Sequence, residues 1–271
     1  QCFLNSDGSF NWNKQIGSQW FMQKAKEYGV NYLTGWLNSP PYFMTKNSYT
    51  FRTSTVPSYN LDASNYSKYG EFLANVAKHF EDVGTPFNFI SPINEPQWSW
   101  SATVGSASQA GSYCTNAEAA GVVKAINAQF ELMNVSSKIL IPEAGGLNYL
   151  SSVVSGESAT SNQATSFWGT ASANYVGNQS HVSNYVAGHS YWINADVNTA
   201  VSIRQALVNK MKLVNPSLQY WQTEFSLLED ASDGKTEMAP MDYSMFISRV
   251  IHFDLVEGNC SGWSFWTSLS R

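Results

Sequence analysis

Charged residues are scarce in this sequence of 271 amino acids. Lys, Arg, Asp and Glu make up 13% of the chain, about half of the ~25% that is usual in globular proteins. The formal net charge is −5, and no cluster of five or more Lys and Arg residues occurs. Because nucleic-acid binding depends on concentrated positive charge, the composition argues against a nucleic-acid partner.

Cysteines and long apolar runs are also few. The three cysteines, Cys2, Cys114 and Cys260, do not make a disulfide framework, and their spacing matches no zinc pattern. A single disulfide between Cys2 and Cys114 is one alternative. Because the number of cysteines is odd, at least one thiol is free. No apolar run approaches the ~20 residues of a membrane span, and no signal peptide opens the chain. We therefore expect no membrane partner.

Aromatic residues, in contrast, are plentiful. They make up 14% of the chain, including ten Trp and fourteen Tyr. With so few charges, the polarity of the surface must come largely from Ser, Thr, Asn and Gln. Such a surface suits a secreted, periplasmic or cell-surface protein that handles neutral polymers. The length allows residues 1–271 to form one domain with a sizeable core.

Short β-rich runs alternate with longer amphipathic segments, which predicts a parallel sheet. The Ser/Gly/Asn-rich segments 99–115 and 151–184 are predicted as loops. Ser64 and Asn116 are the expected N-caps of two helices. The predicted strands cover residues 30–36, 87–93, 138–144, 185–192, 218–226 and 261–267, and the predicted helices cover residues 15–29, 64–82, 116–134, 197–214 and 240–257.

Two observations favour a (β/α)8 TIM barrel over a doubly wound sheet. No Gly-rich phosphate loop follows any predicted strand. Polar and aromatic residues gather at the C-terminal ends of the strands, where barrel active sites lie. Six strands do not close an eight-stranded barrel, so we expect the first two βα units to be missing from this chain.

Two glutamates lie at or near strand ends in otherwise apolar or aromatic surroundings. Glu95 follows the predicted strand 87–93, and Glu224 lies on the predicted strand 218–226. Retaining hydrolysis of a glycosidic bond needs two carboxyl groups, one to protonate the leaving oxygen and one to attack the sugar. We predict that Glu95 and Glu224 form such a pair. The alternative is that each is an ordinary solvated carboxylate.

Three further polar residues are candidates for the same site. Glu143 is either a structural support or a sugar contact. His189 and Tyr191 alternate on the predicted strand 185–192 and so point the same way. Tyr191 is then placed to hydrogen-bond Glu224 and His189 to bind a sugar hydroxyl, unless both simply pack in the barrel interior.

Tryptophans offer flat faces on which sugar rings stack. Trp98 and Trp266 are candidates for this role, whereas Trp263 is better explained as core. No GxSxG, HExxH or close His pair occurs, so serine-hydrolase and metal chemistry find no support. The complete set of sugar-binding candidates is Asn38, Asn94, Trp98, Glu143, His189, Tyr191 and Trp266.

Five motifs together resemble glycoside hydrolase family 30, and within it the endo-β-1,6-galactanase-like members. The motifs occur in the expected order, and the resemblance runs from about residue 1 to residue 271. They are NSPPYFMTKN (38–47), FISPINEPQWSW (89–100), AGHSYW (187–192), YWQTEFS (220–226) and GWSFWT (262–267).

The resemblance implies a role for each matching residue. Glu95 corresponds to the general acid/base and Asn94 to the residue that contacts the sugar 2-hydroxyl. Glu224 corresponds to the nucleophile and Tyr191 to the tyrosine beside it. The family's catalytic barrel has two strands before the one predicted at residues 30–36, and its members usually carry a β-sandwich; neither has a counterpart in this sequence.

We therefore expect a retaining endo-hydrolase that cleaves a β-linked neutral polysaccharide. The first candidate substrate is β-1,6-galactan. The alternatives are another β-glycan, such as β-1,6-glucan or xylan, and a carbohydrate-binding protein without catalysis. The mechanism requires no cofactor and no metal. The expected partner is a poly- or oligosaccharide, and the sequence does not predict an oligomeric state.

Overall fold

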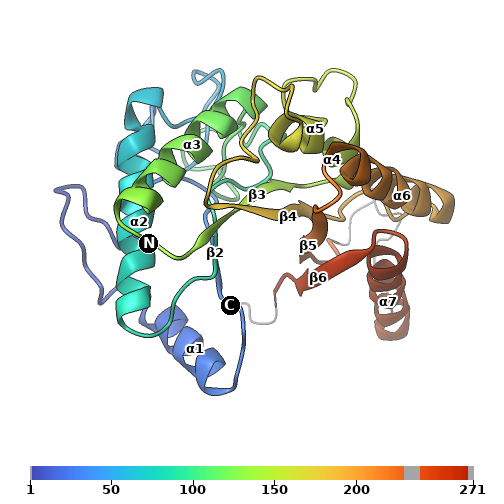
Figure 1. Cartoon of the computed structure of the whole chain (residues 1–271), viewed down its shortest axis with the longest axis horizontal. Helices are drawn as coiled ribbons and strands as arrows, with labels where there is room; N and C mark the ends of the chain where they lie inside the picture. Colours follow the sequence, from blue (N-terminus) through green and yellow to red (C-terminus); the bar gives the residue numbers. More distant parts are fainter. Residues whose placement is uncertain (1, 229–238, 268–271) are drawn as a thin grey trace. The chain divides into compact units, whose positions relative to one another are not determined.

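The protein, described from a computed structural model, contains a parallel α/β sheet (Figure 1). The structure describes residues 2–228 and 239–267. Six strands follow one another in chain order, β1 (Thr34–Trp36), β2 (Phe89–Ser91), β3 (Lys138–Ala144), β4 (Val182–His189), β5 (Gln219–Phe225) and β6 (Cys260–Phe265). The pairs β1–β2, β2–β3, β4–β5 and β5–β6 are parallel. The predicted parallel sheet is confirmed.

The chain divides into two compact units. The first unit consists of Gln1–Asn94, Trp98–Leu140 and Asn178–Ser183. The second unit consists of Glu95–Gln97, Ile141–Gly177 and Asn184–Arg271. The single domain expected over residues 1–271 stays a prediction, and each unit is described by itself.

In the first unit, two long helices lie side by side (Figure 1). Helix α2 buries residues at helical spacing, among them Tyr69, Leu73 and Phe80. Gly70 lets the helices approach, because a Cβ there would lie 2.9 Å from the carbonyl oxygen of Ala125. The helices of this unit are α1 (Ile16–Glu27), α2 (Tyr66–Asp82) and α3 (Asn116–Leu132), with the short 3₁₀ helices η1 (Tyr42–Met44) and η2 (Ala63–Asn65).

The predicted caps of α2 and α3 are wrong. The N-cap of α3 is Thr115, whose side chain accepts a hydrogen bond from the backbone of Glu118, and the Glu118 side chain bonds back to Thr115. This capping box is the Thr-x-x-Glu pattern of residues 115–118. Ser64 lies inside η2, where its backbone N–H donates to Asp62. A side chain that caps must lie one position before the first helical residue.

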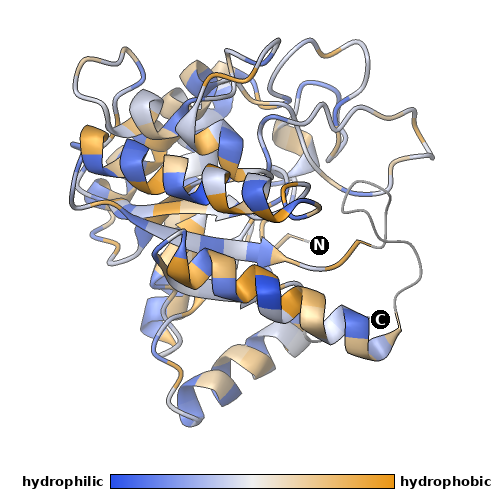
Figure 2. Cartoon of the chain, turned by 90° about the vertical axis from the view of Figure 1, so that its right-hand side faces the viewer, coloured by the Kyte–Doolittle hydropathy of each residue, from blue (hydrophilic) through white to orange (hydrophobic). Residues whose placement is uncertain are grey.

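Among the described residues of the second unit, four helices occur. In Figure 2, α6 and α7 face the viewer and interleave polar and apolar residues. Their buried residues include Leu207 of α6 and Val250 of α7; Val250 packs with Tyr191 and Phe225 in the core of this unit. The helices are α4 (Leu147–Ser151), α5 (Gln163–Trp168), α6 (Val197–Val214) and α7 (Pro240–Val256).

Three further sequence expectations change. Helix α5 interrupts the predicted loop 151–184, because Phe167 and Trp168 at its end are buried. Strand β4 ends at His189, so Tyr191 lies beyond the strand expected over residues 185–192. The three cysteines are free, so the Cys2–Cys114 disulfide that was one alternative from the sequence is not formed. Within the described ranges, no helix has the length and apolarity needed to cross a membrane.

Candidate active site

Three glutamates and a histidine meet in the second unit. Glu95 stands in the short segment Glu95–Gln97, and Glu143 lies on β3 near its end. His189 is the last residue of β4 and is opposite Glu224 in the β4–β5 register. The carboxyl ends of parallel strands lie at the same edge of a sheet. The sheet therefore brings together side chains that are up to 129 residues apart in sequence (224 − 95 = 129).

The imidazole of His189 lies between two of the carboxylates. Its Nδ1 is 2.9 Å from Glu95 Oε1, and its Nε2 is 3.2 Å from Glu143 Oε2. Glu224 Oε1 is 4.0 Å from the same Nδ1. His189, Glu95 and Glu143 are buried, whereas 26% of the Glu224 side chain is exposed. Glu224 is therefore the carboxylate of this cluster most open to a ligand.

The carboxylates keep His189 protonated. Burial alone would lower its pKa, because it disfavours the charged ring. Hydrogen bonds to Glu143 and Glu95, together with the charges of Glu95 and Glu224, outweigh burial and raise the pKa to about 10. At neutral pH both ring nitrogens then carry protons, and each donates to a carboxylate. The ring is thus engaged with glutamates on both sides, which was not expected from the sequence.

Tyr191 holds Glu224 from the other side. Its hydroxyl donates to Glu224 Oε1 at 3.2 Å. Burial and the charge of Glu224 raise the pKa of Tyr191, so the phenol stays protonated and remains a donor. Burial also raises the pKa of Glu224, an effect that the charge of His189 and the hydrogen bond from Tyr191 oppose. These two residues therefore favour the ionised form of a partly buried carboxylate.

Thr223 is a member of the cluster that the sequence analysis missed. Its hydroxyl donates a short hydrogen bond to Glu143 Oε2, the oxygen that also faces His189. Glu143 is fully buried, as expected of a supporting residue. The signal in the sequence was the position of Thr223 directly before Glu224 on β5. Neighbouring side chains of a strand point to opposite faces, so this position does not by itself assign Thr223 to the site of Glu224.

The backbone is strained at two of the glutamates. Glu95 has φ of 42° and Glu143 has φ of 57°, in the left-handed region that non-glycine residues rarely adopt. The backbone N–H of Glu95 donates to the carbonyl oxygen of Glu143 at 2.9 Å, which ties the two strained residues together. Such strain costs roughly 1–3 kcal/mol per residue and clusters at functional sites.

The cluster also has the composition of a metal site. Glu95, His189 and Glu224 each offer a ligand atom, and these atoms lie within 4.8 Å of one another. A histidine binds metal through an unprotonated nitrogen. A metal ion would have to displace a proton from His189, and the absence of a metal stays a prediction from the sequence.

The other predicted sugar-binding residues are distributed over both units. Asn94 is buried in the first unit, directly before Glu95. Asn38 lines a cavity of about 860 Å³ in the first unit, and Trp98 lines a second hollow of about 590 Å³ there. Trp266, in the second unit, donates its backbone N–H to Phe225 and exposes 49% of its surface. Sugar binding by these residues stays a prediction.

The protonated state of His189 predicts that the free energy of unfolding depends on pH. Its pKa in the folded protein, about 10, lies above the ordinary value of 6.5. Between these two values the folded protein holds one proton more than the unfolded chain. The free energy of unfolding should therefore fall as pH rises, by up to about 1.4 kcal/mol per pH unit. The contribution is complete below the ordinary pKa and is lost above the raised one.

Urea unfolding at about pH 7 and about pH 8.5 measures this slope. The range stays below the ordinary thiol pKa of 9.0, which limits titration of the cysteines, and any remaining cysteine titration is shared by the variant described next. A His189→Gln variant, which cannot titrate, should show a smaller slope. Equal slopes in the two proteins would mean that His189 is neutral in the folded state.

Comparison with known proteins defines the class of the protein. A family model described as O-glycosyl hydrolase family 30 matches residues 1–271, the whole chain. Because the match covers more than half of the chain, it shows which family this protein is a member of. It belongs to family 30, and the resemblance seen in the five motifs is confirmed.

Relatives with known sequence or structure cover different shares of the chain. Over 133 residues the chain is 29% identical to the endo-β-1,6-galactanase of Hypocrea rufa, which covers 49% of this chain and 27% of that protein. A conserved exported protein from Bacteroides fragilis superposes over 100% of this chain and 55% of its own, with a TM-score of 0.91 and 32% identity.

More distant structures agree on the fold. The catalytic domain of the GH30 xylanase C from Talaromyces cellulolyticus superposes over 99% of this chain and 55% of its own. The TM-score is 0.64 and the identity is 17%, so this likeness shows the fold alone. The chain spans about half the length of these two solved relatives.

Proposed function

We propose that this protein hydrolyses a β-linked neutral glycan with retention of configuration at the anomeric carbon. Glu224 attacks that carbon and forms a glycosyl-enzyme intermediate. Glu95, which in the reacting state carries a proton on Oε2 while Oε1 accepts from His189 Nδ1–H, first protonates the leaving oxygen. It then, as a carboxylate, removes a proton from the water that releases the sugar. The two half-reactions return both carboxyl groups to their starting states.

The proposal rests mainly on the short distance between the carboxyl groups of Glu95 and Glu224. A carboxylate oxygen of Glu95 and one of Glu224 lie within 4.8 Å of each other. Retaining glycosidases hold their two carboxyl groups about 5–5.5 Å apart, whereas inverting enzymes separate them by about 6.5–9.5 Å to admit a water molecule. The short separation supports attack by Glu224 itself.

The surroundings support the assignment of the two roles. Glu224 is the more exposed of the pair, and the Tyr191 hydroxyl and the charge of His189 favour its ionised form, which a nucleophile needs. Glu95 is buried, and its Oε1 is fixed by the N–H of His189. Glu143 and Thr223 orient the ring from its other side. His189 and Glu143 act as positioning residues in this proposal.

β-1,6-Galactan is the first substrate to test. The support is the endo-β-1,6-galactanase of Hypocrea rufa, 29% identical over about half of this chain. β-1,6-Glucan and xylan remain the other candidates, because loops rather than the catalytic pair decide the sugar. The exported relative from Bacteroides fragilis and the low fraction of charged residues support a secreted or cell-surface location.

We also propose that the six strands belong to a (β/α)8 barrel. Their order never reverses along the sheet. A doubly wound sheet has a point where the strand order reverses, whereas a barrel is wound in one direction. The likeness in fold to family 30 enzymes also supports a barrel.

Release of reducing ends from β-1,6-galactan tests the function, with β-1,6-glucan and xylan assayed in parallel. We expect release from galactan and none from the Glu224→Gln variant, which should still bind the glycan. Proton NMR of the first product should show the β-anomer. Binding without release by the unchanged protein would favour a carbohydrate-binding role, and a first product in the α form would exclude retention.

A further inference from the structure

A buried ion pair joins two helices of the second unit. Arg204 of α6 places its Nε 2.7 Å from Oδ1 of Asp254 on α7, and neither side chain is exposed. Removing two charges from water costs several kcal/mol per ion, and apolar residues of similar size often replace such pairs without loss of stability. The pair therefore calls for an explanation in addition to helix packing.

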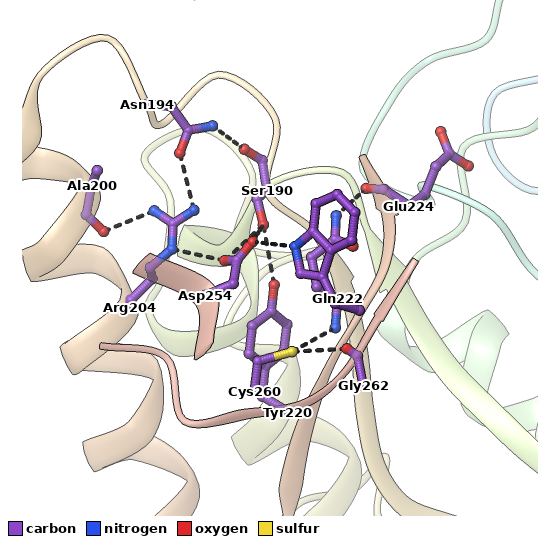
Figure 3. Close-up of polar contacts among 11 residues, drawn as sticks. Ser190, Asn194, Ala200, Arg204, Tyr220, Gln222, Glu224, Asp254, Cys260 and Gly262 are labelled. Carbon is purple, nitrogen blue, oxygen red and sulfur yellow. Dashed lines mark hydrogen bonds and ion pairs between the residues drawn. The ribbon is translucent and has the colours of Figure 1, made fainter. Parts of the chain in front are cut away.

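The ion pair contacts the hydroxyl of Ser190 directly and its carbonyl by way of Asn194 (Figure 3). The Ser190 hydroxyl lies 2.9 and 2.8 Å from the two carboxylate oxygens of Asp254. The Ser190 carbonyl accepts a hydrogen bond from the side chain of Asn194. Arg204 fixes that same side chain, because its Nη2 donates to Asn194 Oδ1 at 3.0 Å.

Ser190 stands between the two residues that contact the catalytic glutamates. His189 reaches Glu95, and Tyr191 reaches Glu224. Strand β4 ends at His189, and its register with β5 shifts between Gly188 and His189. The backbone at Ser190 therefore lies past the strand, and the contacts to Asp254 and Asn194 hold it there.

We propose that Arg204 and Asp254 are positioning residues for catalysis, which act through Ser190 on His189 and Tyr191. The inference rests on the proposed roles of Glu95 and Glu224. A shift at Ser190 moves both neighbours at once, and through them the two carboxyl groups on which the reaction depends. Misplacement of a reacting group by ~1 Å can lower a rate about 100-fold.

Ser190→Ala is the variant that tests this most directly. It removes one hydroxyl and leaves the Arg204–Asp254 pair in place. We expect kcat to fall about tenfold while KM stays within about twofold of the unchanged protein, because orientation is lost and the substrate surface is kept. Ser161→Ala is the matched control: Ser161 is also buried in the second unit, and its hydroxyl accepts from the backbone of Val154.

Arg204→Lys tests the other half of the network. Lysine keeps a positive charge opposite Asp254, but its ammonium lacks the planar fork that reaches Asp254 and Asn194 together. A fall in kcat with an unfolding midpoint near that of the unchanged protein supports positioning. Unchanged kcat in both Ser190→Ala and Arg204→Lys would overturn the proposal, whatever happens to the unfolding midpoint.

A second readout needs no substrate. The His189 ring faces Glu95, Glu143, Glu224 and Tyr191, and its titration reports how closely they surround it. NMR of the ring nitrogens should show His189 losing its proton at lower pH in Ser190→Ala than in the unchanged protein. An identical titration would contradict positioning. Because this result does not depend on turnover, it separates failure of the inference from failure of the proposed hydrolysis.

Discussion

Glu224→Gly is expected to lower kcat on the glycan by about 10⁴-fold, and sodium azide should restore turnover. The variant removes the proposed nucleophile and leaves space where the anomeric carbon would lie. Azide can attack from the face that Glu224 occupied, which inverts the configuration. The product should therefore be the α-glycosyl azide of a β-linked substrate, which NMR and mass spectrometry identify.

Glu143→Gln is the matched control for this experiment. It removes the charge of another carboxylate that contacts His189 but leaves Glu224 in place. We expect a smaller loss of kcat and no rescue by azide, since the nucleophile is present and no space opens beside the sugar. Formation of a glycosyl azide by Glu143→Gln, or none by Glu224→Gly, would mean that the nucleophile is misassigned.

Glu95→Gln is expected to lower kcat on the glycan by about 10²–10⁴-fold. The loss should depend on the leaving group. An alcohol leaving group needs the proton that Glu95 is proposed to supply, whereas a dinitrophenolate departs without one. Formation of the glycosyl-enzyme intermediate from a dinitrophenyl glycoside should then proceed at nearly the rate of the unchanged protein. Release of the sugar should be slow, because no base activates water.

Burst kinetics on the dinitrophenyl glycoside separate these two steps. A rapid burst followed by a slow steady state identifies Glu95 as acid/base. The same fractional loss on glycan and on activated substrate would assign Glu95 to substrate binding instead.

The helices show how far local pattern predicts this fold. The helix expected over residues 197–214 and the strand expected over 138–144 have those bounds in the structure. The helix begins directly after the capping residue Asp196, and the strand is a short, mostly apolar run. Helix α5 was missed because its six residues carry too little periodicity, and the burial of Phe167 and Trp168 is a tertiary property.

The sequence likewise predicted some residues of the candidate active site but not their contacts. Glu95 and Glu224 stand out in the sequence because each lies in an apolar or aromatic strand setting and within a family motif. Their proximity to each other agrees with that expectation. His189 was singled out as well, but its contacts were not: its two nitrogens face Glu95 and Glu143, which lie 94 and 46 residues away in sequence.

The sequence by itself determined the family, the parallel α/β class and the two glutamates proposed to act on the substrate, because these depend on local pattern and short motifs. Only the tertiary structure decided which groups surround those glutamates. Thr223, Arg204 and Asp254 look like ordinary strand and helix residues in sequence. Their roles arise from contacts across 80 residues, for Thr223 with Glu143, and 50 residues, for Arg204 with Asp254. Hydrogen bonds and ion pairs over such separations depend on how strands and helices pack, which no local pattern specifies.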